Sequence, residues 1–124
     1  MARLVRPIAL VLTLAIGGLS LSACGSNGAV ADARRACQNV AAALRLQHQS
    51  EKLGITAAQR AHLQQRALSV LLAATSAAAA ATSVDGSWNP LMTTIGEAQR
   101  VPIVNLKASL TRLCQVANSS TPYL

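Results

Sequence analysis

Gln99-Arg100-Val101-Pro102 is the stretch of this 124-residue chain that decides the fold, because it interrupts an otherwise helical pattern. Proline has no amide hydrogen to donate, so it fits only the first turn of a helix, and it pushes the preceding residue towards extended backbone. Two folds are therefore open. Pro102 either kinks one long helix over residues 90–118, which gives a three-helix bundle, or opens a fourth helix after a reversal of the chain.

The segments before this stretch predict two long helices. Residues 31–52 contain no Pro or Gly, and their apolar residues recur at three- and four-residue steps, the spacing of one helix face. Gly54 ends this helix, and Thr56 is placed to cap a second helix that runs from residue 57 to about residue 82. The two helices are expected to form a hairpin.

The second helix contains an uncharged run of 18 residues, 67–84, so a membrane-spanning helix must be weighed. Residues 73–82 contain only Ala, Ser and Thr, which gain little from transfer into hydrocarbon. Small side chains with high helix propensity instead suit a helix that packs closely against its neighbours. We therefore favour a central core helix.

A loop rich in turn formers, residues 83–90, separates the second helix from the C-terminal third of the chain. Its Asn89-Pro90 pair predicts the N-cap and first residue of the next helix. Trp88, the single tryptophan, is expected to plug one end of the core, and a ligand-stacking role is the alternative. Beyond Pro102 the apolar residues again keep helical spacing, so that segment is helical in either fold.

The N-terminal segment has the three parts of an export signal. Two arginines precede an apolar run over residues 8–21, which is shorter than the roughly 20 apolar residues that a membrane-spanning helix needs. Leu21-Ser22-Ala23-Cys24 then resembles the lipobox of bacterial lipoproteins. The resemblance implies cleavage between Ala23 and Cys24, and attachment of diacylglycerol and acyl chains such as palmitate to Cys24. An ordinary secretory signal is the alternative.

These assignments divide the chain into four parts: a signal peptide (1–23), an acylated cysteine with a flexible tether (24–30), a helical bundle domain (31–119) and a C-terminal tail (120–124). The whole pattern looks like the small uncharacterised helical lipoproteins of mycobacteria and other actinobacteria. That likeness is one of type, and it transfers no functional residue except Cys24. It implies a lipid-anchored protein on the extracytoplasmic face of the cell membrane.

The cysteines distinguish the two folds. With Cys24 assigned to lipid, Cys37 and Cys114 remain, and an even number of cysteines in an exported protein predicts a disulfide. A disulfide needs Cα atoms within about 7 Å, whereas a straight three-helix bundle would hold these two roughly 20 to 25 Å apart. A reversal before Pro102 brings Cys114 back towards Cys37. The disulfide therefore favours an all-α, antiparallel four-helix bundle.

The charge balance favours acidic partners. Beyond the signal, the chain has nine basic and four acidic residues, a formal charge of +5. Such a surface suits anionic headgroups or acidic envelope polymers, and the alternative is a surface that is simply solvated in an alanine-rich protein. Nucleic acid is not expected, because an exported protein does not meet it and there are too few aromatic side chains for base stacking.

The residues show no recognisable catalytic pattern, so no enzyme activity is expected. The four carboxylates form no obvious pair, Asp32 and Asp85 are expected to cap helices, and neither a G-x-S-x-G elbow nor a Gly-rich phosphate loop occurs. No cofactor or metal is expected either. The alternative is a zinc site in which His48 and His62 join the two bundle cysteines, or bind a metal as a pair at the hairpin.

The sequence therefore predicts an envelope lipoprotein that acts as a non-enzymatic interaction or structural module. Arg34 and Arg35 are expected near the membrane, and Arg60 and Arg66 towards the distal hairpin. The alternative is a helical lipoprotein whose alanine-lined interior holds a small apolar ligand or cofactor. Small side chains usually bring helices together rather than leaving a cavity, so the first hypothesis is favoured.

Overall fold

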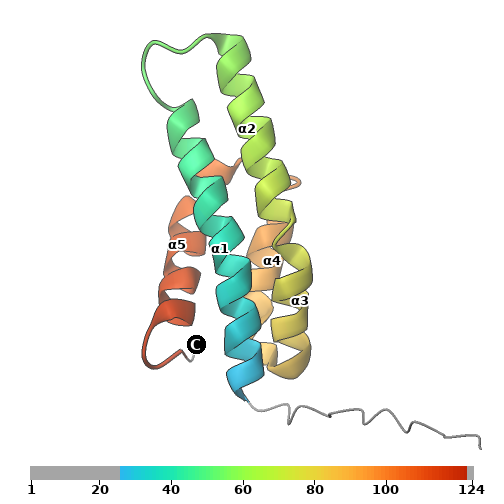
Figure 1. The fold of residues 1–124 in the computed structure, drawn as a ribbon. Coiled ribbons are helices and arrows are strands. Elements are labelled where there is room, and N and C mark those ends of the chain that lie inside the picture. Colours follow the sequence, from blue (N-terminus) through green and yellow to red (C-terminus); the bar gives the residue numbers. More distant parts are fainter. Residues whose placement is uncertain (1–25, 123–124) are drawn as a thin grey trace, which may run out of the picture.

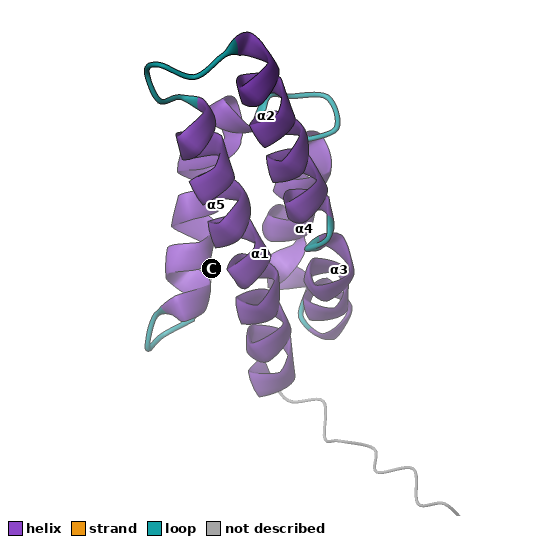
Figure 2. Ribbon diagram, turned by 45° about the horizontal axis from the view of Figure 1, so that its top comes forward, coloured by secondary structure: helices purple, strands orange, loops and turns teal. Residues whose placement is uncertain are grey.

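The computed structural model describes residues 26–122. Their helices are α1 (Ser26–Ser50), α2 (Ala57–Leu72), α3 (Thr75–Val84), the short 3-10 helix η1 (Gly86–Trp88), α4 (Asn89–Glu97) and α5 (Ile103–Asn118). Because α2 and α3 continue each other as one rod, the described residues form an antiparallel bundle of four rods without strands (Figure 1). Figure 2 shows the same all-helical arrangement from a second direction. The predicted four-helix bundle is confirmed, and the three-helix alternative is wrong.

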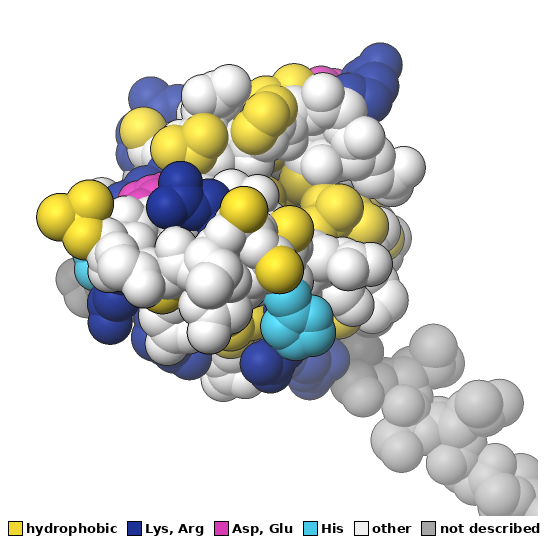
Figure 3. All heavy atoms as spheres, turned by 90° about the horizontal axis from the view of Figure 1, so that it is seen from above, with side chains coloured by type: hydrophobic (Ala, Val, Ile, Leu, Met, Phe, Trp, Pro, Cys, Tyr) yellow, Lys and Arg dark blue, Asp and Glu magenta, His cyan; other side chains and the backbone are white. Residues whose placement is uncertain are grey.

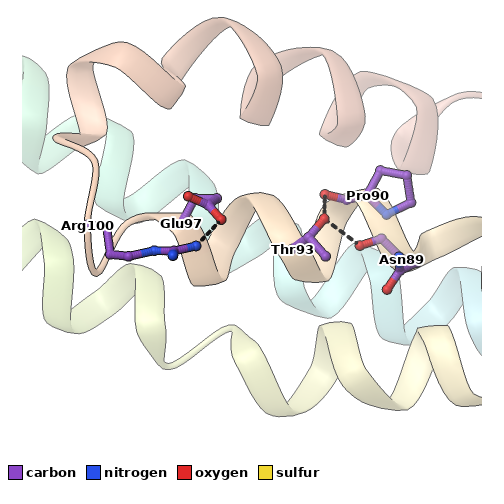
Figure 4. Close-up of polar contacts among 5 residues, drawn as sticks. All are labelled: Asn89, Pro90, Thr93, Glu97 and Arg100. Carbon is purple, nitrogen blue, oxygen red and sulfur yellow. Dashed lines mark hydrogen bonds and ion pairs between the residues drawn. The ribbon is translucent and has the colours of Figure 1, made fainter.

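The chain reverses between α4 and α5, where the sequence predicted it. The amides of Arg100 and Val101 both donate to the carbonyl oxygen of Glu97, at 2.9 and 2.8 Å, and close the end of α4. The Arg100 guanidinium also lies 2.6 Å from the Glu97 carboxylate (Figure 4). Pro102 then occupies the N-cap of α5 with extended backbone, and its carbonyl accepts from the amide of Asn105 at 2.9 Å. Its missing amide hydrogen therefore costs no helical hydrogen bond.

The hairpin between α1 and α2 has the predicted cap. The Gln59 amide donates to the Thr56 hydroxyl at 3.1 Å, and the Thr56 amide donates to the Gln59 side chain at 2.8 Å, so the two residues form a capping box. The expectation that Gly54 ends the first helix is wrong, because α1 ends at Ser50; Gly54 lies in the loop that follows, with a φ of +84° that favours glycine. The hairpin extends beyond α4 and α5, so its end is open to solvent (Figure 1).

The predicted second helix has a tightened turn at Ala73 and Ala74. The Ala74 amide donates to the carbonyl of Leu71, three residues back, at 3.0 Å, and regular helix resumes at Thr75. The rod Ala57–Val84 is long and apolar enough to cross a membrane, with a mean hydropathy of 1.7 over its most apolar 18 residues. A core helix meets the same criterion, and the buried alanines of α3 pack in the bundle core.

The core combines large side chains with a close helix contact. Trp88, Leu91 and Ile95 are fully buried where α3, η1 and α4 meet, which confirms that Trp88 plugs one end of the bundle. Since the Trp88 ring is fully buried, it offers no free face for a ligand. Between α1 and α3 the buried side chains are mostly alanines. Their small size lets the two helices approach closely.

Three expectations about helix starts are wrong. Residues 26–30, expected as tether, already belong to α1, because Ala29 and Val30 are buried and extend its apolar face. Asp32 therefore lies inside α1 and pairs with Arg35 at 2.9 Å instead of capping a helix. Asn89 is not an N-cap, because η1 leads directly into α4.

The predicted cap at Asp85 is confirmed, although the helix it caps is the short η1. Its carboxylate accepts from the amide of Ser87 at 3.0 Å.

On the outer face of α4, the Thr93 hydroxyl donates to the carbonyl oxygens of Asn89 and Pro90, at 3.0 and 3.2 Å (Figure 4). The Thr93 side chain thus adds hydrogen bonds to carbonyl oxygens of the first turn of α4.

Candidate ligand-binding groove and basic surface

The predicted cleavage and acylation residues, Ala23 and Cys24, lie outside the described residues. Helix α1 begins at Ser26, only two residues beyond Cys24. Two residues span at most about 7 Å, even when fully extended. An acyl group on Cys24 would therefore hold the N-terminal end of the bundle close to the membrane surface.

Cys37 and Cys114, the predicted disulfide pair, are brought together. Their sulfur atoms lie 2.04 Å apart and their Cα atoms 5.5 Å apart, so the pair ties α1 to α5. Cys37 is buried and Cys114 is half-buried. Since each sulfur is bonded to the other, neither is free for the zinc site that was the alternative.

The two arginines expected near the membrane are exposed, but both contact neighbouring groups of the bundle. Arg34 donates from Nε to the carbonyl of Ala117 at 2.8 Å, and from Nη2 to the carbonyl of Ser119 at 3.2 Å. These contacts place its positive charge at the C-terminal end of α5, where the helix dipole favours a cation. Arg35 is paired with Asp32. Both arginines are thus partly occupied by neighbouring groups.

The exposed cations without an ion pair lie further along the chain. Within residues 26–122, six further basic side chains are exposed and, unlike Arg34, make neither an ion pair nor a hydrogen bond: Arg45, Lys52, Arg60, Arg66, Lys107 and Arg112. Viewed onto the hairpin end, Lys and Arg side chains lie around the edge of the molecule, with apolar side chains between them (Figure 3). This surface is suited to contact with an anionic partner.

Three of these six cations line a groove between α1 and α5, together with apolar side chains. One hollow, of about 400 Å³, lies over the disulfide, and a second, of about 430 Å³, continues it towards the hairpin. Ala41 and Leu44 line both hollows, so the two form one continuous groove, which we name the α1–α5 groove. Three cations and a histidine line its distal hollow: Arg45, His48, Lys52 and Lys107.

A different cleft lies between the α1–α2 hairpin and the α4–α5 turn. It has a volume of about 470 Å³, and the polar groups that line it are the side-chain amides of Gln47, Gln64 and Gln65. Gln47 is buried and donates to the Glu51 carboxylate at 3.0 Å. No charged side chain lines this cleft, so it offers less selectivity than the groove for an ionic ligand.

The histidines do not gather with other metal ligands. His48 lies on α1 and His62 on α2, and both side chains are exposed. Among the residues that the structure describes, no group of three or more His, Cys, Asp or Glu side chains is placed to hold a metal ion.

Sequence reasoning found the cysteine pair but missed the groove. A signal for it was present: Ala41, Arg45, His48 and Lys52 follow one another at helical steps of four, three and four residues. This spacing puts them along one side of the first helix. What the sequence did not indicate is that Lys107 of α5 would face the same stripe.

Comparison of the chain with protein-family models, with curated proteins and with solved structures found no match. A functional proposal therefore depends on the residues of this chain.

Proposed function

We propose that this protein is a lipoprotein, acylated at Cys24 and held on the extracytoplasmic face of the cell membrane, whose helical bundle binds an acidic partner without catalysing a reaction. The lipobox-like stretch Leu21-Ser22-Ala23-Cys24 supports the anchor. The short connection from Cys24 to α1 supports a bundle that stands directly on the membrane.

The observation that carries the binding role is the set of six exposed cations that, within the described residues, make neither an ion pair nor a hydrogen bond. Arg34 and Arg35, at the membrane end, are engaged by groups of the bundle. In contrast, Lys52 and Arg60 lie towards the hairpin, away from the proposed anchor. The proposal therefore places the acidic partner at the side and distal end of the bundle.

The anchor is tested by replacing the proposed acylation residue. In an actinobacterial host, the wild-type chain should partition into the detergent phase of Triton X-114, and Cys24→Ser should move to the aqueous phase. Ser22→Thr is the matched control, since it changes the same segment but leaves the thiol. Detergent-phase partition of Cys24→Ser equal to that of the wild type would overturn the proposed anchor.

The binding role is tested by charge. We expect a crosslinked partner in intact cells to be lost when Arg45, Lys52, Arg60 and Arg66 are all changed to Gln, and to dissociate as salt rises, because exposed ionic contacts are screened. Circular dichroism should show that the variant remains helical. A partner that is retained by the variant and is insensitive to salt would contradict the proposal.

A further inference from the structure

We propose that the α1–α5 groove binds a single-chain anionic amphiphile, with the acyl chain over the disulfide and the anionic headgroup at the distal, basic end. This ligand role goes beyond the proposed membrane anchor and does not depend on it. The observation that supports this proposal is that one end of the groove is lined mainly by apolar side chains and the other end by basic ones.

The proximal half of the groove is suited to an acyl chain. Its floor consists of Cys37, Val40, Ala41 and Leu44 from α1, and the α5 side is formed by Cys114 beside three polar side chains, those of Thr111, Gln115 and Asn118. Val40 is fully buried at the base, and Ala41 adds only a methyl group beside it. A flexible chain that lies along the exposed Ala41 and the half-buried Leu44 and Cys114 would remove apolar surface of both molecules from water, which favours binding.

The distal half is suited to an anionic headgroup. Arg45 approaches from α1, Lys52 from the loop that follows it and Lys107 from α5, and no Asp or Glu lines either hollow of the groove. The nearest carboxylate in the sequence, that of Glu51, accepts a hydrogen bond from Gln47, and Gln47 lines the separate cleft beside α2. The three cations therefore have no carboxylate in the groove to neutralise them.

The dimensions of the groove match such a ligand. Along α1, Cys37 and His48 are separated by about 17 Å, at the helical rise of about 1.5 Å per residue. The two hollows, of about 400 and 430 Å³, are of the size of known small-molecule sites, which are roughly 300 to 1,000 Å³. A medium-length acyl chain with one compact headgroup can occupy both.

The narrowness of the groove favours an acyl chain over a helix of another protein. Cys37 and Cys114 hold the backbones of α1 and α5 at a Cα–Cα distance of 5.5 Å. A helix with its side chains is about 10 Å across, so it could rest only on the rim. A flat bilayer surface would likewise touch only the rim. A single acyl chain is narrow enough to lie along the line where the two helices meet.

The test uses the oxidised chain 24–124 with Cys24→Ser, which carries no acyl group. Lauroyl lysophosphatidylglycerol is the anionic probe and lauroyl lysophosphatidylcholine the zwitterionic one, both below their micelle concentrations. Titration calorimetry should give at least tenfold tighter binding of the anionic probe. Its addition should shift the backbone NMR signals of residues 37–48 and 107–118.

Variants test each half of the groove. Arg45→Gln combined with Lys107→Gln should weaken binding of the anionic probe about tenfold and leave binding of the zwitterionic probe unchanged. Ala41→Trp should fill the proximal half and weaken both probes. Arg60→Gln with Arg66→Gln removes the same charge from α2, outside the groove, and should change neither affinity. Circular dichroism and thermal melting should show that each variant remains folded.

Four results would overturn this inference. Equal affinity for both probes would remove the role of the basic end, and equal binding of free glycerol phosphate would remove that of the apolar floor. NMR shifts confined to the α2 side, at Gln64, Gln65 and Leu68, would place the ligand in the other cleft. Binding only to phosphatidylglycerol vesicles, with no response to the monomeric probe, would indicate contact with a membrane surface instead.

Discussion

Removing the link between Cys37 and Cys114 should destabilise the bundle more than any single surface change. The two residues are 77 positions apart, so the bond closes most of the domain into one loop. In the chain-entropy model, a loop of this length lowers the entropy of the unfolded state by about 15 cal/mol/K, which corresponds to about 4.5 kcal/mol at 25 °C. The double variant Cys37→Ala/Cys114→Ala should therefore lose about that free energy of unfolding.

Urea denaturation followed by circular dichroism measures this loss. With an m value of about 1.5 kcal/mol/M, the midpoint should fall by about 3 M. The wild-type protein reduced with dithiothreitol should show the same midpoint as the double variant. Ser109→Ala, an exposed change on α5, should leave it within about 0.5 M of the wild type. A loss below about 1 kcal/mol in the double variant would refute the reasoning from loop closure.

Substitutions at three further positions test individual contacts by urea or thermal denaturation. Thr56→Ala removes the capping box and should cost about 1 kcal/mol, and an unchanged midpoint would show that the cap is not needed. Arg34→Gln should cost about 1 to 2 kcal/mol and speed amide exchange at the end of α5; unchanged exchange there would argue against the contact to that helix end. Trp88→Ala should cost about 3 to 5 kcal/mol because the ring is fully buried. Trp88→Phe should cost less, since the indole nitrogen has no hydrogen-bond partner among the described protein atoms, and equal losses for the two variants would contradict this.

Features with a local chemical cause could be predicted from the sequence. The Thr56 cap follows from a hydroxyl placed three residues before a glutamine, and an interruption of the helix at Pro102 follows from the missing amide of proline, although only the cysteine pair favoured a reversal over a kink. The pairing of Cys37 with Cys114 was predicted because the lipobox resemblance assigns Cys24 to lipid and leaves two cysteines in an exported chain. In each case a short stretch or a simple distance restricted the possible structures.

Features set by tertiary contacts could not be predicted in the same way. Residues 26–30 looked like a tether because Gly28 and its small polar neighbours favour flexible chain, but burial of Ala29 and Val30 extends the helix through them. The contact of Arg34 with the carbonyl of Ala117 joins residues 83 positions apart, and nothing near Arg34 in the sequence indicates it.

The candidate groove likewise has a part that could be predicted from the sequence and a part that could not. The basic stripe along α1 is visible in the spacing of Arg45, His48 and Lys52. The position of Lys107 beside it depends on how α5 packs against α1, which spacing alone does not determine. The residues of the groove that come from the first helix could therefore be found from the sequence, whereas the contribution of Lys107 could be found only from the fold.

Mass spectrometry of the mature N-terminus tests most directly the central claim, that Cys24 anchors this bundle to the membrane. Protein purified from actinobacterial membranes should begin at Cys24, and its N-terminal peptide should carry the mass of a diacylglycerol thioether with or without a further acyl chain. A mature chain that begins at another residue, or a membrane-bound chain whose Cys24 is unmodified, would contradict the account.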